Sequence, residues 1–251
     1  MSPFFILIAF AALLVFSTAI TYLIISMKIP VLILLLLDIG LMLLDEISSV
    51  IESIIIAIYH PRIYSEKDIS PINCANWDSV SFLSISSLIR QFTNKKIAYV
   101  GSISVPALKM TVPLASTTND PIYHFGAGML EPRLIDKTAP LVVGAHNLGS
   151  GSRCLFSPLA QNYLYLLGQT VLVSNFAVVK EFTIQFVKII GAYDVSSAFD
   201  GQSNSLTLLT CTNDNQFRIL IRAKLVKKYP YHLASQSIKG LIKTKNMILN
   251  V

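Results

Sequence analysis

The sequence predicts an all-β domain, a closed or nearly closed barrel of about eight strands with short helices, behind one or two N-terminal membrane helices. Two observations support this prediction. Most of the apolar excess lies before residue 60, and from Lys96 onward short apolar runs alternate with a period of two between polar loops. With 251 residues, 53% hydrophobic and 14% charged, the chain can hold one ordinary domain beside membrane segments.

The first apolar stretch, Phe4–Met27, carries no charge and is longer than the roughly 20 residues that a membrane-spanning helix needs. A cleaved signal peptide is the competing interpretation. It is less favoured, because no Lys or Arg precedes the stretch and the apolar run exceeds the usual hydrophobic region of a signal peptide.

A second apolar stretch, Val31–Tyr59, is interrupted by acidic residues at positions 38, 45, 46 and 52. An acidic group at the centre of a lipid-spanning helix raises the free energy of insertion by about 2.5–3.5 kcal/mol. We therefore expect only Ile29–Leu44 to lie in lipid, where Asp38 would need a polar partner or a tilt of the helix. Lys28, between the two stretches, favours the cytoplasmic side. We therefore expect residues 1–59 to anchor the chain in the cell membrane and the domain to lie on the extracellular face, with the number of spans left open.

The rest of the chain divides by composition into three parts. We expect a polar connector at residues 60–95, with a weak helical pattern near Val80–Ile89. The barrel is expected at residues 96–226, and a basic tail at residues 227–251. The alternation slips at Val187, which indicates a β-bulge or a strand buried on both faces. Runs rich in Val, Ile, Leu, Phe and Thr predict strands at Tyr99–Val105, Leu141–Gly144, Thr170–Ser174, Glu181–Ile190, Leu206–Thr210 and Phe217–Val226.

The net charge is +6, and much of the positive charge lies after residue 217. A solvated basic face is the favoured interpretation, and attraction to an anionic surface such as phospholipid head groups is the alternative. No motif supports binding to nucleic acid. The three cysteines, Cys74, Cys154 and Cys211, leave at least one thiol free or intermolecular, and no His/Cys spacing suits zinc.

Cys211 ends its predicted strand where a polar loop begins, so its thiol is expected at a rim of the barrel. Arg218 opens the next strand, and a hairpin would bring the guanidinium close to the thiol. Arg222 competes for this position, but it lies about 13 Å further along an extended strand. A free cysteine is most often a small buried hydrophobe, and we keep that interpretation for Cys154. At Cys211 the rim position and the nearby cation favour a nucleophile.

His146 follows the predicted strand Leu141–Gly144, which ends in small residues that let another segment approach closely. The histidines at positions 60, 124 and 232 have no comparable setting at the end of a strand. A thiol, an imidazole and a fixed cation together are the groups that acyl transfer needs.

These motifs, taken together, resemble those of the sortase family. Thr207–Cys211 reads TLLTC and resembles the family's TLxTC signature, and Arg218 matches the catalytic arginine on the following strand. Gly144–Asn147 is similar to the family's histidine loop. The segments Leu155–Leu159, which reads LFSPL, and Pro121–Met129, which contains GAGM, are similar to family segments, and the resemblance runs from about Asn76 to Leu225.

The resemblance implies a cysteine transpeptidase that cleaves LPXTG-type sorting signals of surface proteins between Thr and Gly. It implies that Cys211 attacks the threonine carbonyl, Arg218 stabilises the oxyanion and His146 protonates the departing amine. An amine of a peptidoglycan precursor, lipid II, would then resolve the thioester. The resemblance also implies that Leu209 and Thr210 bind the sorting peptide, with the Phe182–Ser205 region closing over it. No cofactor is expected.

Two features are similar to the housekeeping, class A type of sortase. No long apolar stretch follows Leu225, and no Asp-Pro-aromatic lid precedes Lys96. The calcium-binding acidic cluster of some members is not evident, since only Glu131 and Asp136 lie in the corresponding stretch, and no metal is predicted. The family's membrane anchor resembles Ile33–His60, so the residues before Met27 look like an extension.

Two other functions stay open. Another cell-wall cysteine acyltransferase or protease is one, although L,D-transpeptidase-like enzymes carry Ser-His-Gly-Cys where this chain has Leu208–Cys211, reading Leu-Leu-Thr-Cys. The second is a membrane-tethered β-barrel binding module without catalytic activity.

Overall fold

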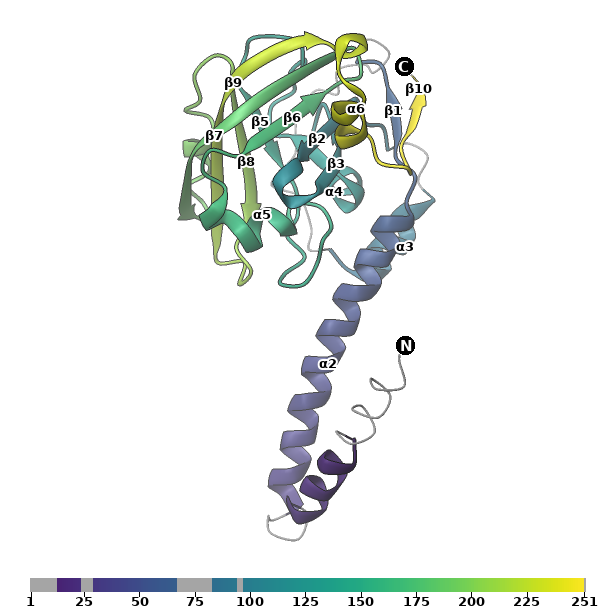
Figure 1. Cartoon of the computed structure of the whole chain (residues 1–251). Coiled ribbons are helices and arrows are strands. Elements are labelled where there is room, and N and C mark those ends of the chain that lie inside the picture. The colour runs from purple at the N-terminus through teal and green to yellow at the C-terminus, as the bar shows by residue number, and fades with distance from the viewer. Residues whose placement is uncertain (1–12, 24–28, 67–82, 94–96, 251) are drawn as a thin grey trace. The chain divides into compact units, whose positions relative to one another are not determined.

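The computed structural model describes residues 13–23, 29–66, 83–93 and 97–250. By its internal contacts the chain divides into two compact units, Met1–Ser48 and Ser49–Val251. The second unit contains the whole barrel (Figure 1).

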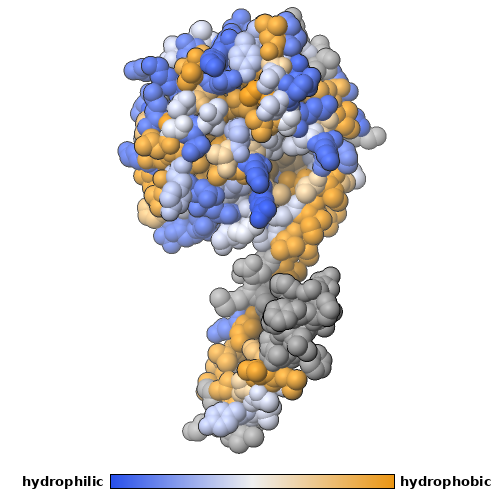
Figure 2. Space-filling model, in the orientation of Figure 1, coloured by the Kyte–Doolittle hydropathy of each residue, from blue (hydrophilic) through white to orange (hydrophobic). Residues whose placement is uncertain are grey.

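The N-terminal part is helical wherever it is described. Residues 13–23 form a helix, and α2 spans Ile29–Ile58. Apolar side chains in the first half of α2, among them Ile33, Leu34 and Leu37, are exposed. Figure 2 shows hydrophobic surface on the described part of the chain outside the barrel.

The expected membrane helices are not supported by the described helices. None of the helices in the described parts of the chain is both long enough and apolar enough to cross a membrane. The expected span at Phe4–Met27 lies outside the described residues except for residues 13–23.

The predicted closed barrel is confirmed, with eight strands in the order β2-β3-β4-β5-β8-β9-β7-β6 (Figure 1). Three of its pairings, β2 with β6, β5 with β8 and β7 with β9, join strands that are not consecutive along the chain, so hairpins alone do not close it. The strands are β2 (Gly101–Val105), β3 (Met110–Ala115), β4 (Ala127–Met129), β5 (Leu141–Gly144), β6 (Thr170–Ser174), β7 (Val178–Gly191), β8 (Ser205–Cys211) and β9 (Phe217–Pro230).

The barrel closes around one main core to which every barrel strand contributes apolar side chains. In β8, Leu206 and Leu208 point into this core, whereas Leu209 belongs to a smaller cluster with Leu220 of β9 and Val195. This split follows from the period of two, because alternate side chains of a strand face opposite sides of the sheet. The face of β8 that carries Leu209 is therefore the outer face of the barrel.

The strand β7 is irregular, as the slip near Val187 predicts. Its pairing with β9 shifts register between Ile184 and Phe186, and again between Glu181 and Phe182. An extra residue on one strand is the mark of a β-bulge, which increases the local twist.

Two strands of the barrel, β3 and β4, were not among the six predicted from the sequence. Pro113 lies inside β3, and β4 is only three residues long and centred on Gly128. A Cβ atom on Gly128 would lie 2.4 Å from the carbonyl oxygen of Thr117, so the glycine permits a close approach of two backbone segments.

Short helices and a small sheet accompany the barrel. The α-helices are α3 (Ile85–Phe92), α4 (Asp120–Phe125), α5 (Ser157–Asn162) and α6 (Gln236–Ile242), and the 3-10 turns are η2 (Pro106–Leu108), η3 (Tyr163–Tyr165), η4 (Val195–Ala198) and η5 (Tyr231–Leu233). The strands β1 (Arg62–Tyr64) and β10 (Ile248–Asn250) pair in parallel. Residues 227–251, expected as a basic tail, thus extend β9 to Pro230 and then form η5, α6 and β10.

The last turns of α2 belong to the barrel unit. Tyr59, just after the helix, stacks on Phe125 with ring centroids 4.0 Å apart. The Ser53 and Ser152 hydroxyls lie 3.1 Å apart, and Ile56 packs against the main core. These contacts hold the residues around Ser53 beside the loop that follows β5.

Replacement of Gly128 by Ala tests the close approach in β4. Because the new methyl group would meet a backbone oxygen that cannot rotate away, Gly128→Ala should lower the free energy of unfolding by about 1–3 kcal/mol in chemical denaturation. Gly240→Ala is the matched control. Gly240 lies in α6, and a Cβ atom added there would have no neighbour within 4 Å, so this change should be neutral or stabilising by up to about 1 kcal/mol. Equal effects of the two changes would contradict the packing argument.

Candidate active site

The register of three neighbouring strands determines where the candidate catalytic residues lie. The strands β5 and β8 pair in parallel, with Gly144 opposite Leu209. His146 and Cys211 each lie two residues beyond this pair, so both emerge at the same edge of the sheet. On the other side of β8, Arg218 of β9 is the direct antiparallel partner of Cys211. Imidazole, thiol and guanidinium thus come from adjacent positions on three adjacent strands.

A cavity of about 620 Å³ opens at this edge. Its lining includes all five residues selected from the sequence: His146, Cys211, Arg218, Leu209 and Thr210. The other lining residues come from the segments before the barrel, from α4 and β5, and from the loops around the site: Glu52, Leu83, Tyr123, Leu130, Gly144, Ala145, Asn147, Leu148, Gly149, Ala192, Tyr193, Val195, Asn213 and Asn215.

Hydrogen bonds tie the histidine loop to the strand that carries the thiol. The Ala145 N–H donates to the Leu209 carbonyl at 3.3 Å, and the Thr210 hydroxyl donates to the Ala145 carbonyl at 3.0 Å. Asn147 Nδ2 donates to the Cys211 carbonyl at 3.0 Å and to Asn213 Oδ1 at 2.9 Å. The loop therefore cannot shift relative to Cys211 without breaking several bonds at once.

Arg218 is held by the backbone of its own hairpin. One guanidinium nitrogen, Nη1, donates to the carbonyls of Asn215 at 3.1 Å and Phe217 at 3.0 Å. In the described parts of the chain no carboxylate pairs with it, so its remaining N–H groups can donate into the cavity.

The competing arginine, Arg222, is engaged elsewhere. Its guanidinium donates to the Ser197 carbonyl at 2.7 Å and lies 5.4 Å from the centroid of the Phe186 ring. Arg222 is not part of the cavity lining. The geometry therefore favours Arg218 as the cation beside the thiol.

Burial keeps the imidazole neutral. Desolvation, and to a smaller extent the nearby His124, lower the pKa of His146 to about 4, although Asp120 acts in the opposite direction. The His146 Nε2 atom is buried and has no hydrogen-bond partner within the described residues. No hydrogen bond within the described residues therefore has to break before this nitrogen gains or loses a proton.

Burial also raises the pKa of the Cys211 thiol, and the Arg218 guanidinium partly opposes this shift. With the thiol pKa raised and the imidazole pKa lowered, the neutral pair predominates near pH 7. The thiolate–imidazolium pair, which is the nucleophilic form, is then a minor species in equilibrium with it.

Tyr123, in α4, is a cavity residue that was not selected from the sequence. Its ring meets the His146 ring edge-on, with centroids 5.5 Å apart and an interplanar angle of 71°. A Cβ atom on Gly144 would lie 2.3 Å from the Tyr123 hydroxyl, so the glycine before the histidine loop makes room for this phenol. The only feature of the sequence that could have identified Tyr123 as a cavity residue is its position in the Pro121–Met129 segment. The local sequence pattern does not distinguish Tyr123 from its neighbours in that segment.

The two described free thiols have different surroundings. Cys154 lies outside the cavity lining, and its Sγ is 3.5 Å from the Ser53 carbonyl oxygen. Burial raises the pKa of Cys154 as it does that of Cys211, but no cation among the described residues opposes the shift at Cys154 and the thiol does not line the active-site cavity, which fits a structural role. Cys74 lies outside the described residues.

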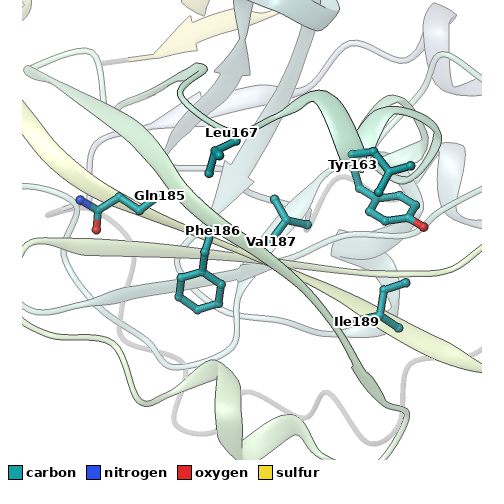
Figure 3. A pocket seen from close by; sticks show the side chains of 7 residues that line it. Tyr163, Leu167, Gln185, Phe186, Val187 and Ile189 are labelled. Atoms are coloured by element: carbon teal, nitrogen blue, oxygen red, sulfur yellow. The ribbon is translucent and has the colours of Figure 1, made fainter.

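A second cavity, of about 460 Å³, lies beside the middle of β7 (Figure 3). Its walls come from η3, the loop after it and the middle of β7, and they are mostly apolar: Tyr163, Leu164, Leu167, Gln185, Phe186, Val187 and Ile189. None of these side chains is a thiol, an imidazole or a carboxylate, so this cavity lacks the groups for acyl transfer.

Residues 103–226 match the family model described as Sortase domain, and this segment includes His146, Cys211 and Arg218. No curated protein matches the chain. Solved structures similar to it include sortase A of Listeria monocytogenes, with 20% identity, a TM-score of 0.49, and coverage of 56% of this chain and 94% of that one. Sortase C of Streptococcus pneumoniae has 24% identity, a TM-score of 0.45, and coverage of 53% and 69%.

The Thr210 hydroxyl offers a test of how the histidine loop is positioned. Thr210→Val keeps the shape of the side chain but leaves the buried Ala145 carbonyl without its hydrogen-bond donor. This should lower the free energy of unfolding by about 1–3 kcal/mol. Loss of the positioning bond should also lower the rate at which the Cys211 thiol is acylated, by about ten- to a hundredfold. Thr210→Ser keeps the donor and should stay near wild type in both measurements. Similar losses in both variants would assign the effect to packing.

The pH dependence of alkylation tests the state of the thiol. Alkylation of Cys211 by iodoacetamide should rise with pH around a midpoint above the usual thiol range of about 8.5, because burial disfavours the thiolate. Arg218→Gln should move the midpoint higher, since it removes the cation that lowers the thiol pKa. Arg218→Lys keeps a positive charge and should move it less. A midpoint that stays in place in Arg218→Gln would exclude coupling between the two groups.

Proposed function

We propose that this chain is a sortase, a cysteine transpeptidase that attaches surface proteins to the cell wall. One observation carries the proposal: the thiol, the imidazole and the guanidinium converge on a single cavity at the edge of β5, β8 and β9. The match of residues 103–226 to the sortase domain supports it.

In the first step the Cys211 thiolate attacks the carbonyl carbon of the scissile peptide bond. Arg218 donates to the oxyanion that develops, because its guanidinium is always charged and planar. His146, as imidazolium, protonates the departing amine, and a thioester to Cys211 remains. In the second step an amine attacks the thioester in place of water, and the sulfur leaves.

We further propose that the acyl donor is an LPXTG-type sorting signal cleaved between Thr and Gly, and that the acceptor is an amine of the peptidoglycan precursor lipid II. Leu209 and Thr210 line the cavity, and the loop between β7 and β8 adds Ala192, Tyr193 and Val195. Tyr193 is fully exposed beside the cavity, so it is available to cover an extended peptide. These apolar walls suit the leucine and proline of such a signal.

We also propose that the chain is a sortase of the class A type. We further propose that residues 1–59 anchor it in the cell membrane, with the lipid-embedded part ending at Leu44, and that the barrel lies on the extracellular face. The exposed apolar side chains of α2 support membrane attachment, since contiguous apolar surface of this kind is typical of membrane or protein contacts. The class A type is supported by the sequence before Lys96, which contains no Asp-Pro-aromatic lid.

Intact mass after incubation with an LPXTG peptide tests the proposal directly. The wild-type chain should gain the mass of the peptide up to its threonine, as a thioester on Cys211, and Cys211→Ala should gain nothing. Arg218→Lys should form the adduct at least about a hundredfold more slowly, because an ammonium cannot reproduce the planar fork of donors. Cys154→Ala is the matched control and should behave as wild type.

The alternatives predict other outcomes. Cleavage that survives Cys211→Ala would contradict the assignment of the nucleophile. Binding of the peptide with neither adduct nor cleavage would favour the membrane-tethered binding module. An adduct formed only with other acyl donors would favour another cell-wall cysteine acyltransferase or protease.

A further inference from the structure

The active-site cavity contains a second charged side chain, which takes no part in the acylation step. Glu52, in the last turns of α2, lines the same cavity as Cys211, His146 and Arg218. It belongs to the barrel unit, Ser49–Val251, although it precedes residues 103–226 by some fifty positions. Among the lining residues it is the one carboxylate, opposite in charge to Arg218.

The contacts of neighbouring residues hold Glu52 at the cavity. Ser53 meets Ser152 with hydroxyls 3.1 Å apart, and the Ser53 carbonyl accepts from the Cys154 thiol at 3.5 Å. Ser152 and Cys154 lie in the segment that connects His146 to α5. Ile56, one helical turn after Glu52, packs against the main core. The helix end and the histidine loop therefore form one connected wall.

The Glu52 carboxylate has neither an ion-pair partner nor a hydrogen-bond donor among the residues that the structure describes. It is partly buried, and desolvation raises its pKa. A partly desolvated carboxylate without a partner gains most from a cation or a charge-assisted N–H donor. Since the described residues supply none, the complementary group is expected from a ligand.

We propose that Glu52 forms the acceptor subsite, where it binds the ammonium group of the amine that resolves the thioester. This inference rests on the proposed function and concerns its second step. The first step consumes a neutral peptide carbonyl and needs a cation, which Arg218 supplies. The second step brings in a primary amine, which is mostly an ammonium ion in neutral water, and an anion at the cavity wall attracts it.

The step balances without any further reactant. The bound ammonium gives one proton to the Glu52 carboxylate and becomes a free amine. Its nitrogen attacks the thioester carbonyl carbon, so a C–N bond forms and the C–S bond to Cys211 breaks. The second nitrogen proton passes through His146 to the departing sulfur, which restores the neutral thiol and imidazole. Glu52 later returns its proton to water.

The experiment measures the two half-reactions separately in the intact chain. The rate of acyl-enzyme formation with an LPXTG peptide reports the first step, and resolution of the acyl-enzyme by increasing glycinamide reports the second. Glu52→Gln keeps the size of the side chain and removes its charge. It should raise the KM for glycinamide about three- to tenfold and shift products toward hydrolysis, with the acylation rate within about twofold of wild type.

Two controls separate charge from structure. Glu181→Gln removes the same charge from a partly buried carboxylate on β7, outside the cavity lining, and should leave the glycinamide KM unchanged. Hydroxylamine, a nucleophile that is uncharged near neutral pH, should resolve the acyl-enzyme of Glu52→Gln as fast as that of wild type. Melting temperatures of the variants check that each is folded.

The outcomes are distinct. An unchanged glycinamide KM in Glu52→Gln, or an equal loss with hydroxylamine, would overturn the acceptor subsite while leaving the transpeptidase intact. A slower acylation with unchanged amine kinetics would place Glu52 on the acyl-donor side and overturn the proposal as well. Absence of any acyl-enzyme in the wild-type chain would instead refute the proposed function itself.

Discussion

The parallel pairing of β5 with β8 is the constraint on which the site depends. Because Gly144 lies opposite Leu209, the residues two positions further on, His146 and Cys211, leave the sheet side by side. A shift by one residue would turn one of these side chains to the other face of the sheet, since the strand period is two. The antiparallel partner strand β9 then adds Arg218 directly across from Cys211. Barrel closure, which buries both strands in a common core, stabilises this register.

Burial has opposing effects on reactivity at this site. It lowers the pKa of His146 and raises that of Cys211, so both groups are mostly neutral and the nucleophilic ion pair is scarce. The same desolvation strengthens every electrostatic interaction in the cavity, including those that the Arg218 guanidinium makes there. A thiol that is mostly protonated is also less readily oxidised or alkylated.

The cavity is assembled from segments far apart in the sequence. The barrel supplies the thiol, the imidazole and the guanidinium, while α2 supplies Glu52 and the segment before α3 supplies Leu83. Hydrogen bonds between Ser53 and the loop after β5 connect these parts. A segment that precedes the barrel is thereby placed at the cavity wall where we propose that the acceptor enters.

Much of the barrel was predictable, because Leu206, Leu208 and their counterparts on other strands alternate with outward-facing residues. β3 and β4 were not, since Pro113 and Gly128 interrupt the pattern that identifies a strand. None of the described helices is long and apolar enough to cross a membrane, so the structure does not support the membrane helices expected before residue 60. In α2, acidic residues interrupt the apolar run. In the site, Cys211, His146 and Arg218 were selected from their positions at strand ends, whereas Tyr123 and Glu52 were not.

By itself, the sequence determined the strand periodicity, the residue types that acyl transfer requires and the proximity of Cys211 to Arg218, because a hairpin is a local feature. Only the tertiary structure decided that His146 joins them, that Arg222 is engaged elsewhere, and that Tyr123 and Glu52 complete the cavity. These relations depend on parallel pairing and on packing between segments tens of residues apart, which no local pattern encodes.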